Sequence, residues 1–205
     1  KKKKKKKAQI ANLGVIPDLL RICEEASSEV VLCMALATLW SLAGENGQVR
    51  KQISVLGGLR MVLCLMPKIQ DSKTMEQLVG LIGNLTWNSP TQMETLHVCG
   101  GIEMLVKVCR TTDSFPVMFR VLGTLGHIAL SSIYCEQLLS LNYLGIVTNI
   151  CDKVRVSEVA AEAVANIYAL CKHSPAAQSD FVALNGIEAR EKNKIRRKKK
   201  EEEGG

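Results

Sequence analysis

The sequence predicts an all-α solenoid, and three observations lead to this fold class. Short glycine-containing segments recur about every 43 residues, apolar residues follow helical spacing between them, and no segment reads as a strand. The composition agrees, because 47% of the 205 residues are hydrophobic. A single repeat of this size cannot bury its apolar face alone, so stacked neighbours are expected to share one continuous core.

The repeat is marked by a turn of small residues. When the second small residue is the anchor, the intervals between anchors are 44, 43 and 85 residues, and 85 is close to two repeats. The missing anchor is expected near Tyr143. A Ser-Pro pair at 89–90 returns at 174–175, again 85 residues later. The four anchors are Gly14, Gly58, Gly101 and Gly186.

Each repeat is expected to contain three helices. A short apolar helix follows each anchor, at about 18–25, 59–66, 102–110 and 144–151. A longer helix comes next, at about 29–43, 73–87, 116–130 and 157–171. Another short helix then closes the unit, at about 48–55, 90–98, 133–141 and 175–184. The five prolines all fall at the proposed boundaries, where a missing backbone N–H is tolerated.

These features resemble the armadillo repeat. The resemblance covers about residues 10–189 and implies a right-handed α-solenoid with about three full repeats and partial units at both ends. HEAT repeats are the alternative, but they usually have two helices and lack the glycine turn. The segments that carry the resemblance are 14–20 (GVIPDLL), 35–42 (ALATLWSL), 82–86 (IGNLT) and 163–167 (AVANI).

The resemblance also implies where a partner would bind. In armadillo proteins the long helices line a concave groove that holds an extended peptide or a partner helix. An asparagine near the end of each long helix bonds the peptide backbone, since its amide both donates and accepts. The corresponding positions are Ser41, Asn84, His127 and Asn166. The two asparagines could instead bridge neighbouring helices, and the sequence leaves both readings open.

Other side chains on the same face set the expected character of the groove. Arg120 and Glu162 carry opposite charges, so a strongly basic groove like that of the catenins is not expected. The tryptophan array with which importin-like proteins read Lys-rich signals is also missing. Trp87 is expected to be an exposed aromatic anchor for the partner, whereas Trp40 is expected in the core.

The sequence contains no signature of catalysis or of metal binding. None of the phosphate-binding, dinucleotide-binding, nucleophile-elbow or zinc-protease motifs occurs. The three histidines are dispersed, and the eight cysteines form no CxxC pair, so they are expected to be mostly buried free thiols. The prediction is a non-enzymatic scaffold or adaptor that binds protein, without a cofactor, a metal or a small-molecule substrate.

The formal charge of +7 is concentrated at the two ends of the sequence. The predicted solenoid at 10–189 lies between a basic tail at 1–9 and a charged tail at 190–205, and the second tail is a candidate helical cap. Residues 8–189 carry a formal charge of −4. Charge-driven binding of nucleic acid or an anionic membrane through these tails is the alternative function. A cytoplasmic location is expected, and the basic run at 196–200 resembles a nuclear-import signal.

Overall fold

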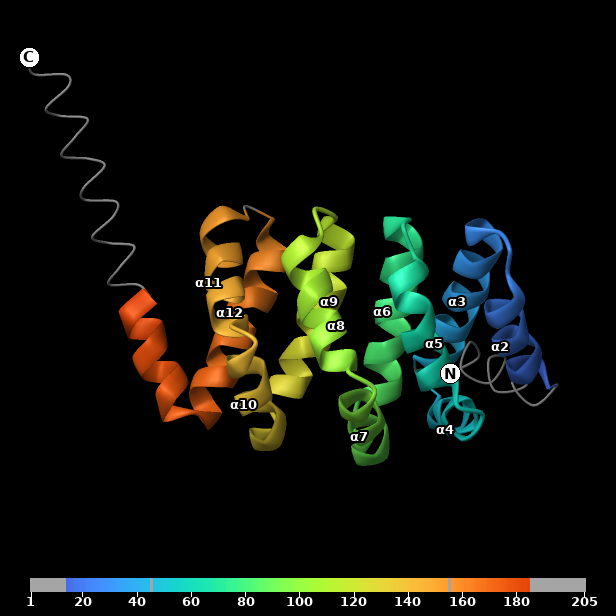
Figure 1. Cartoon of the computed structure of the whole chain (residues 1–205), viewed down its shortest axis with the longest axis horizontal. Helices are drawn as coiled ribbons and strands as arrows, with labels where there is room; N and C mark the ends of the chain where they lie inside the picture. The colour runs from blue at the N-terminus through green and yellow to red at the C-terminus, as the bar shows by residue number, and fades with distance from the viewer. Residues whose placement is uncertain (1–13, 45, 155, 185–205) are drawn as a thin grey trace, which may run out of the picture.

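The computed structural model describes residues 14–44, 46–154 and 156–184, which form a row of stacked helices without a strand (Figure 1). The predicted tails at 1–9 and 190–205 lie outside these residues. Each repeat is counted here from the short helix that closed the predicted unit. The first helices are then α4 (Gly47–Val55), α7 (Pro90–Val98) and α10 (Ser132–Ser140), and a further helix spans 175–184. The second helices are α2 (Val15–Glu25), α5 (Gly58–Leu65), α8 (Gly101–Thr111) and α11 (Tyr143–Lys153), and a 3₁₀ turn, η1 (Met66–Lys68), follows α5.

The long third helices are α3 (Glu29–Ala43), α6 (Ser72–Thr86), α9 (Phe115–Ala129) and α12 (Ser157–His173), and they stand side by side along the molecule (Figure 1). The predicted all-α solenoid of three-helix units is confirmed. Each predicted helix is present, and the largest boundary difference is at α2, which begins three residues earlier than expected.

The turn before each second helix requires a residue in the left-handed conformation. This residue is Gly14, Gly57, Gly100 or Asn142, with φ of 76°, 73°, 69° and 57°. The sequence predicts the second glycine of each pair, Gly58 and Gly101, as the anchor of the turn. In the structure the first glycine of the pair, Gly57 or Gly100, has the left-handed conformation that the turn requires. Asn142 replaces glycine in the last unit, because asparagine adopts this conformation more readily than other residues with a side chain.

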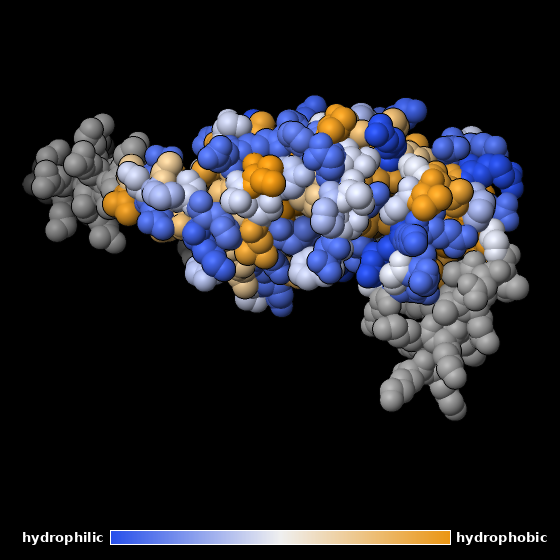
Figure 2. Space-filling model, turned by 90° about the horizontal axis from the view of Figure 1, so that it is seen from below, coloured by the Kyte–Doolittle hydropathy of each residue, from blue (hydrophilic) through white to orange (hydrophobic). Residues whose placement is uncertain are grey.

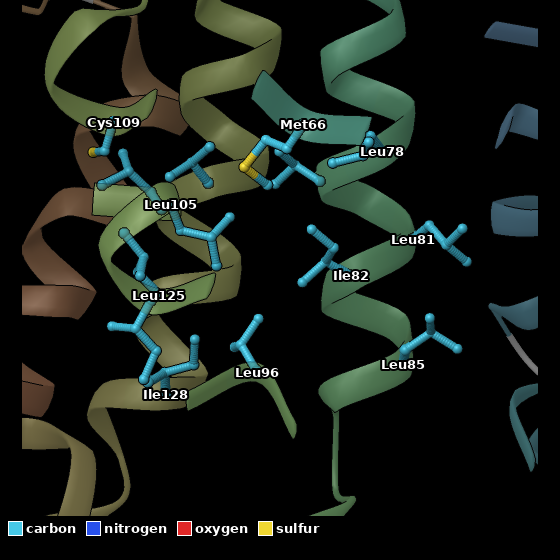
Figure 3. Packing of buried hydrophobic residues seen from close by; sticks show 14 of the residues in the cluster. Met66, Leu78, Leu81, Ile82, Leu85, Leu96, Leu105, Cys109, Leu125 and Ile128 are labelled. Atoms are coloured by element: carbon cyan, nitrogen blue, oxygen red, sulfur yellow. The ribbon is translucent and has the colours of Figure 1, made fainter. Parts of the chain in front are cut away.

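The core runs through the row of helices without a break. In Figure 3, Ile82 of α6 and Leu125 and Ile128 of α9 lie in the same apolar layer, and all three are fully buried. Leu96 of α7 and Leu105 of α8 are also fully buried in this layer. The long helices thus form a layer against which the shorter helices of each repeat pack. This packing determines which face of each long helix stays exposed.

The eight cysteines are free thiols, as predicted, but they are not mostly buried: Cys23, Cys109 and Cys135 are buried, four others are half-buried and Cys64 is exposed. Burial raises the pKa of Cys23 and Cys109 to about 12, so these thiols remain protonated at neutral pH. No helix in the described part of the chain combines the length and apolar character that a membrane span needs. The surface in Figure 2 is mainly hydrophilic, with separate apolar patches.

Candidate functional site

A hollow of about 290 Å³ lies across the four long helices, and we call it the long-helix hollow. Its walls come from α3, α6, α9 and α12, which are separated in sequence by whole repeats. Three residues predicted for the groove line it: Asn84, Arg120 and Glu162. The remaining lining residues are Trp40, Gly80, Gly83, Phe119, Gly123 and Thr124.

Trp40 lines the hollow and is half-buried against the edge of the core, whereas the sequence predicted it within the core. A Cβ atom at Gly80 would lie 2.7 Å from Cε2 of the Trp40 indole, so only glycine lets the ring lie against α6. Gly83 similarly faces the Thr124 hydroxyl of α9. The glycines on α6 therefore leave room for side chains from both neighbouring helices.

Arg120 is held at the centre of the hollow by aromatic and acidic neighbours. Its guanidinium carbon lies 4.6 Å from the centroid of the Trp40 ring and 5.5 Å from that of Phe119. Its Nε is 3.5 Å from Oε1 of Glu76, which forms a half-buried ion pair with it. The buried Nε–H has no hydrogen-bond partner within the described ranges. Because this atom is buried beside the Glu76 carboxylate, its charge is compensated within the protein and a ligand cannot reach it.

Glu76 was not predicted as a functional residue. It lies on α6 four residues before Gly80, which places both on one helical face. This four-residue spacing could have identified Glu76 from the sequence as a residue on the same face as Gly80. With Glu76 and Glu162 beside Arg120, the hollow has both signs of charge, and Glu162 forms no salt bridge with any residue that the structure describes.

Asn84 bridges two long helices and also lines the hollow. Its Nδ2 donates to the backbone carbonyl of Trp40 at 3.3 Å, which was the alternative left open by the sequence. Its side chain remains half-buried at the wall of the hollow. Asn84 thus fixes α6 against α3 and can contact a ligand there.

Asn166 cannot contact a ligand in this structure, and its predicted role is corrected here. Its side chain is fully buried, donates to the carbonyls of Leu122 at 3.0 Å and Glu162 at 2.7 Å, and accepts the Tyr143 hydroxyl at 2.8 Å. The cause is its position in the repeat. Asn166 follows His127 by 39 residues, whereas the units are 42 or 43 residues long, so it occupies the place of the buried Thr124.

The other three predicted residues lie away from the hollow. Ser41 is exposed on α3. Trp87 follows the last residue of α6 and is well exposed, as predicted. Its ring centroid lies 5.4 Å from that of His127 in an edge-on arrangement. Nε2 of His127 is 3.0 Å from the Thr86 hydroxyl oxygen. Trp87 and His127 therefore form a second cluster at the end of α6 and α9.

Burial lowers the pKa of His127 from its ordinary 6.5 to about 4, and a hydrogen bond with the Gly123 backbone opposes this shift only in part. His127 is therefore neutral in the folded protein at neutral pH. In the unfolded chain it would take up a proton near pH 6.5, so the two states differ in bound protons between pH 6.5 and 4.

The stability of the fold is therefore expected to decrease as the pH falls through this window. The pKa difference at His127 corresponds to a loss of about 2 to 3 kcal/mol between pH 6.5 and pH 4. Urea unfolding at a series of pH values checks this. His127→Gln should remove most of the slope and His173→Gln should retain it. An unchanged slope in His127→Gln would show that other groups cause the loss.

The described residues contain no group of three or more His, Cys, Asp or Glu side chains placed to hold a metal ion. The long-helix hollow instead offers an aromatic face, hydrogen-bond donors and the Glu162 carboxylate. This chemistry suits polar and charged groups of a polypeptide.

Comparison with solved structures identifies the fold. Computationally designed armadillo repeat proteins for modular peptide recognition superpose with a TM-score of 0.79 at 19% identity, over 92% of this chain and 78% of that chain. The chain has the armadillo-repeat fold. The designed armadillo repeat protein YIII(Dq)4CqI superposes with a TM-score of 0.73 at 18% identity, over 82% of this chain and 69% of that one.

The armadillo repeats also have sequence relatives. The human protein inscuteable homolog is 26% identical over 193 residues, and the mouse protein inscuteable homolog is 25% identical over 189 residues. Each alignment covers 87% of this chain but 32% of the relative, so the chain spans about a third of the length of both. No protein-family profile matches the chain.

Proposed function

We propose that the chain is a non-enzymatic interaction module that binds an extended peptide of a partner protein along its long helices. The observation that carries the proposal is the long-helix hollow, to which four successive repeats contribute. A designed armadillo repeat protein in complex with the peptide (KR)4 superposes with a TM-score of 0.72 at 18% identity, over 82% of this chain and 69% of that one. Peptide binding is thus compatible with this fold.

The chemistry of the hollow supports a peptide as the ligand. The Arg120 side chain lines the hollow and is 36% exposed, so a peptide carbonyl or side-chain oxygen could accept a hydrogen bond from the exposed part of its guanidinium. Gly123 lets a backbone approach closely, because it presents no side chain and the nearest atom to its Cβ position is Oε2 of Glu162 at 3.9 Å. Glu162 adds a carboxylate that a basic ligand side chain could neutralise. Mixed charge favours a ligand that is not uniformly acidic or basic.

The alternative of charge-driven binding concerns residues outside those that the structure describes. Seven consecutive lysines at the start of the sequence would bind phosphates without reading sequence. Such binding weakens steeply with salt, whereas a ligand held in the long-helix hollow should depend on salt less. The salt dependence of affinity therefore separates the two functions.

Arg120→Ala is expected to weaken peptide binding about tenfold or more, since residues at the centre of an interface dominate its energy. A peptide selected from a display library on the full chain would be titrated against wild type and variant by fluorescence anisotropy. Lys107→Ala is the matched control, because Lys107 is exposed on α8, away from the residues lining the hollow. It should leave the affinity unchanged.

Two results would count against the groove. One is equal affinity for wild type and Arg120→Ala, with both proteins folded by circular dichroism. The other is equal weakening by Arg120→Ala and Lys107→Ala, which would indicate general charge attraction.

A further inference from the structure

The long helix α3 is apolar on nearly all sides. In its sequence, EVVLCMALATLWSLA, the polar residues are Glu29, Thr38 and Ser41. A helix with this pattern is normally covered on every face. Here α2, α4 and α6 contact α3, while Val30 is 69% exposed and Met34 is 68% exposed.

The exposed side of α3 matches the face with which later long helices contact their predecessors. In α6 that contact is made by Gly80, which lies against Trp40, and by Asn84, which bonds the Trp40 carbonyl. The residues 43 positions earlier are Ala37 and Ser41. Met34, Ala37 and Ser41 follow one helical stripe, and the counterpart of Met34 in α6, Gln77, is buried. We call this stripe the leading face.

The last of the four long helices, α12, exposes the complementary face. In α9, Leu122 and Gly126 face the next long helix, since Asn166 bonds the Leu122 carbonyl and lies against Gly126. The residues 42 positions later are Val164 and Tyr168 of α12. They are 58% and 66% exposed, although their counterparts lie in a packed interface. We call these two residues the trailing face.

We propose that two copies of this chain stack head to tail, with the trailing face of one copy on the leading face of the next. These faces are the two halves of an interface that the chain already forms between α3 and α6, α6 and α9, and α9 and α12. Neither contains a charged side chain, so stacking would bury no unpaired charge. The contact is heterologous, because each copy uses a different patch.

A heterologous contact leaves one face free at each end of a dimer, so the assembly should grow with concentration. Sedimentation velocity of the full chain over a concentration series is expected to show a rising sedimentation coefficient. Met34→Glu or Tyr168→Glu should each weaken association about tenfold or more, because each places a charge in an apolar contact.

Mixing the two variants tests the head-to-tail geometry itself. Met34→Glu retains an intact trailing face and Tyr168→Glu an intact leading face, so the mixture should form a one-to-one dimer and nothing larger. Ile133→Glu is the control, because Ile133 is exposed on α10 outside both faces. It should associate like wild type.

Three results would overturn the proposal: a monomer at every concentration, variants that associate as well as wild type, or a mixture that does not pair. Equal weakening by Ile133→Glu would also overturn it, since association would then be unspecific. Peptide affinity is measured separately on each variant and is expected to be unchanged, so this test does not depend on the proposed function.

Discussion

Asn166→Leu is expected to lower the free energy of unfolding by about 3 kcal/mol. The substitution leaves the fully buried Tyr143 hydroxyl without its acceptor and removes the donor to the Leu122 carbonyl. Leucine has nearly the same volume, so the loss comes from unpaired polar groups more than from a cavity. Urea unfolding followed by circular dichroism measures it.

Asn84→Leu is the matched control for this prediction. Asn84 is half-buried and makes a single described hydrogen bond of 3.3 Å, so its loss is expected to cost about 1 kcal/mol or less. Adding Tyr143→Phe to Asn166→Leu should restore about 1 kcal/mol, because the stranded hydroxyl is then gone. Equal effects at Asn84 and Asn166 would contradict the buried network.

Gly101→Val is expected to destabilise the fold by about 3 kcal/mol or more, because it overpacks a closed contact. A Cβ at Gly101 would clash with the Leu96 side chain and lie 3.0 Å from both Cδ2 of Leu63 and the Leu96 carbonyl oxygen. The first helix of one repeat meets the second helix at this point. Thermal or urea unfolding checks the loss.

The neighbouring Gly100 responds to substitution for a different reason. It has φ of 69°, and its Cβ position is nearly open, so Gly100→Ala should cost about 1 to 2 kcal/mol through backbone strain alone. Gly100→Asn should cost less, as Asn142 already serves at the equivalent turn. If Gly100→Ala cost more than Gly101→Val, this division of roles would be wrong.

The helices could be predicted from the sequence because local signals repeat in each unit. The prolines at 90 and 116 lie at helix starts, and apolar spacing defines each long helix. The register of the groove could not be predicted fully, because the Asn-containing segment of α12 lies three residues nearer the start of its helix than that of α6. The motif around Asn166 therefore resembled the one around Asn84 while its place in the repeat differed.

The long-helix hollow was only partly predictable. Arg120 and Glu162 follow from the helical face, but the stacking of Arg120 on Trp40 joins residues 80 positions apart. Local pattern identifies Trp40 as apolar and cannot show that Gly80 opens a space for its ring. Contacts of this kind depend on how successive helices pack, which no single repeat encodes.

The central claim is that a partner peptide occupies the long-helix hollow, and the two tryptophans of the chain report on it directly. Trp40 lines the hollow and Trp87 lies at the end of α6, outside it. Indole N–H resonances of the ¹⁵N-labelled chain, assigned with Trp→Phe variants, would be followed during titration with the selected peptide. We expect the Trp40 resonance to shift most. A peptide that binds while moving only Trp87, or neither tryptophan, would contradict the claim.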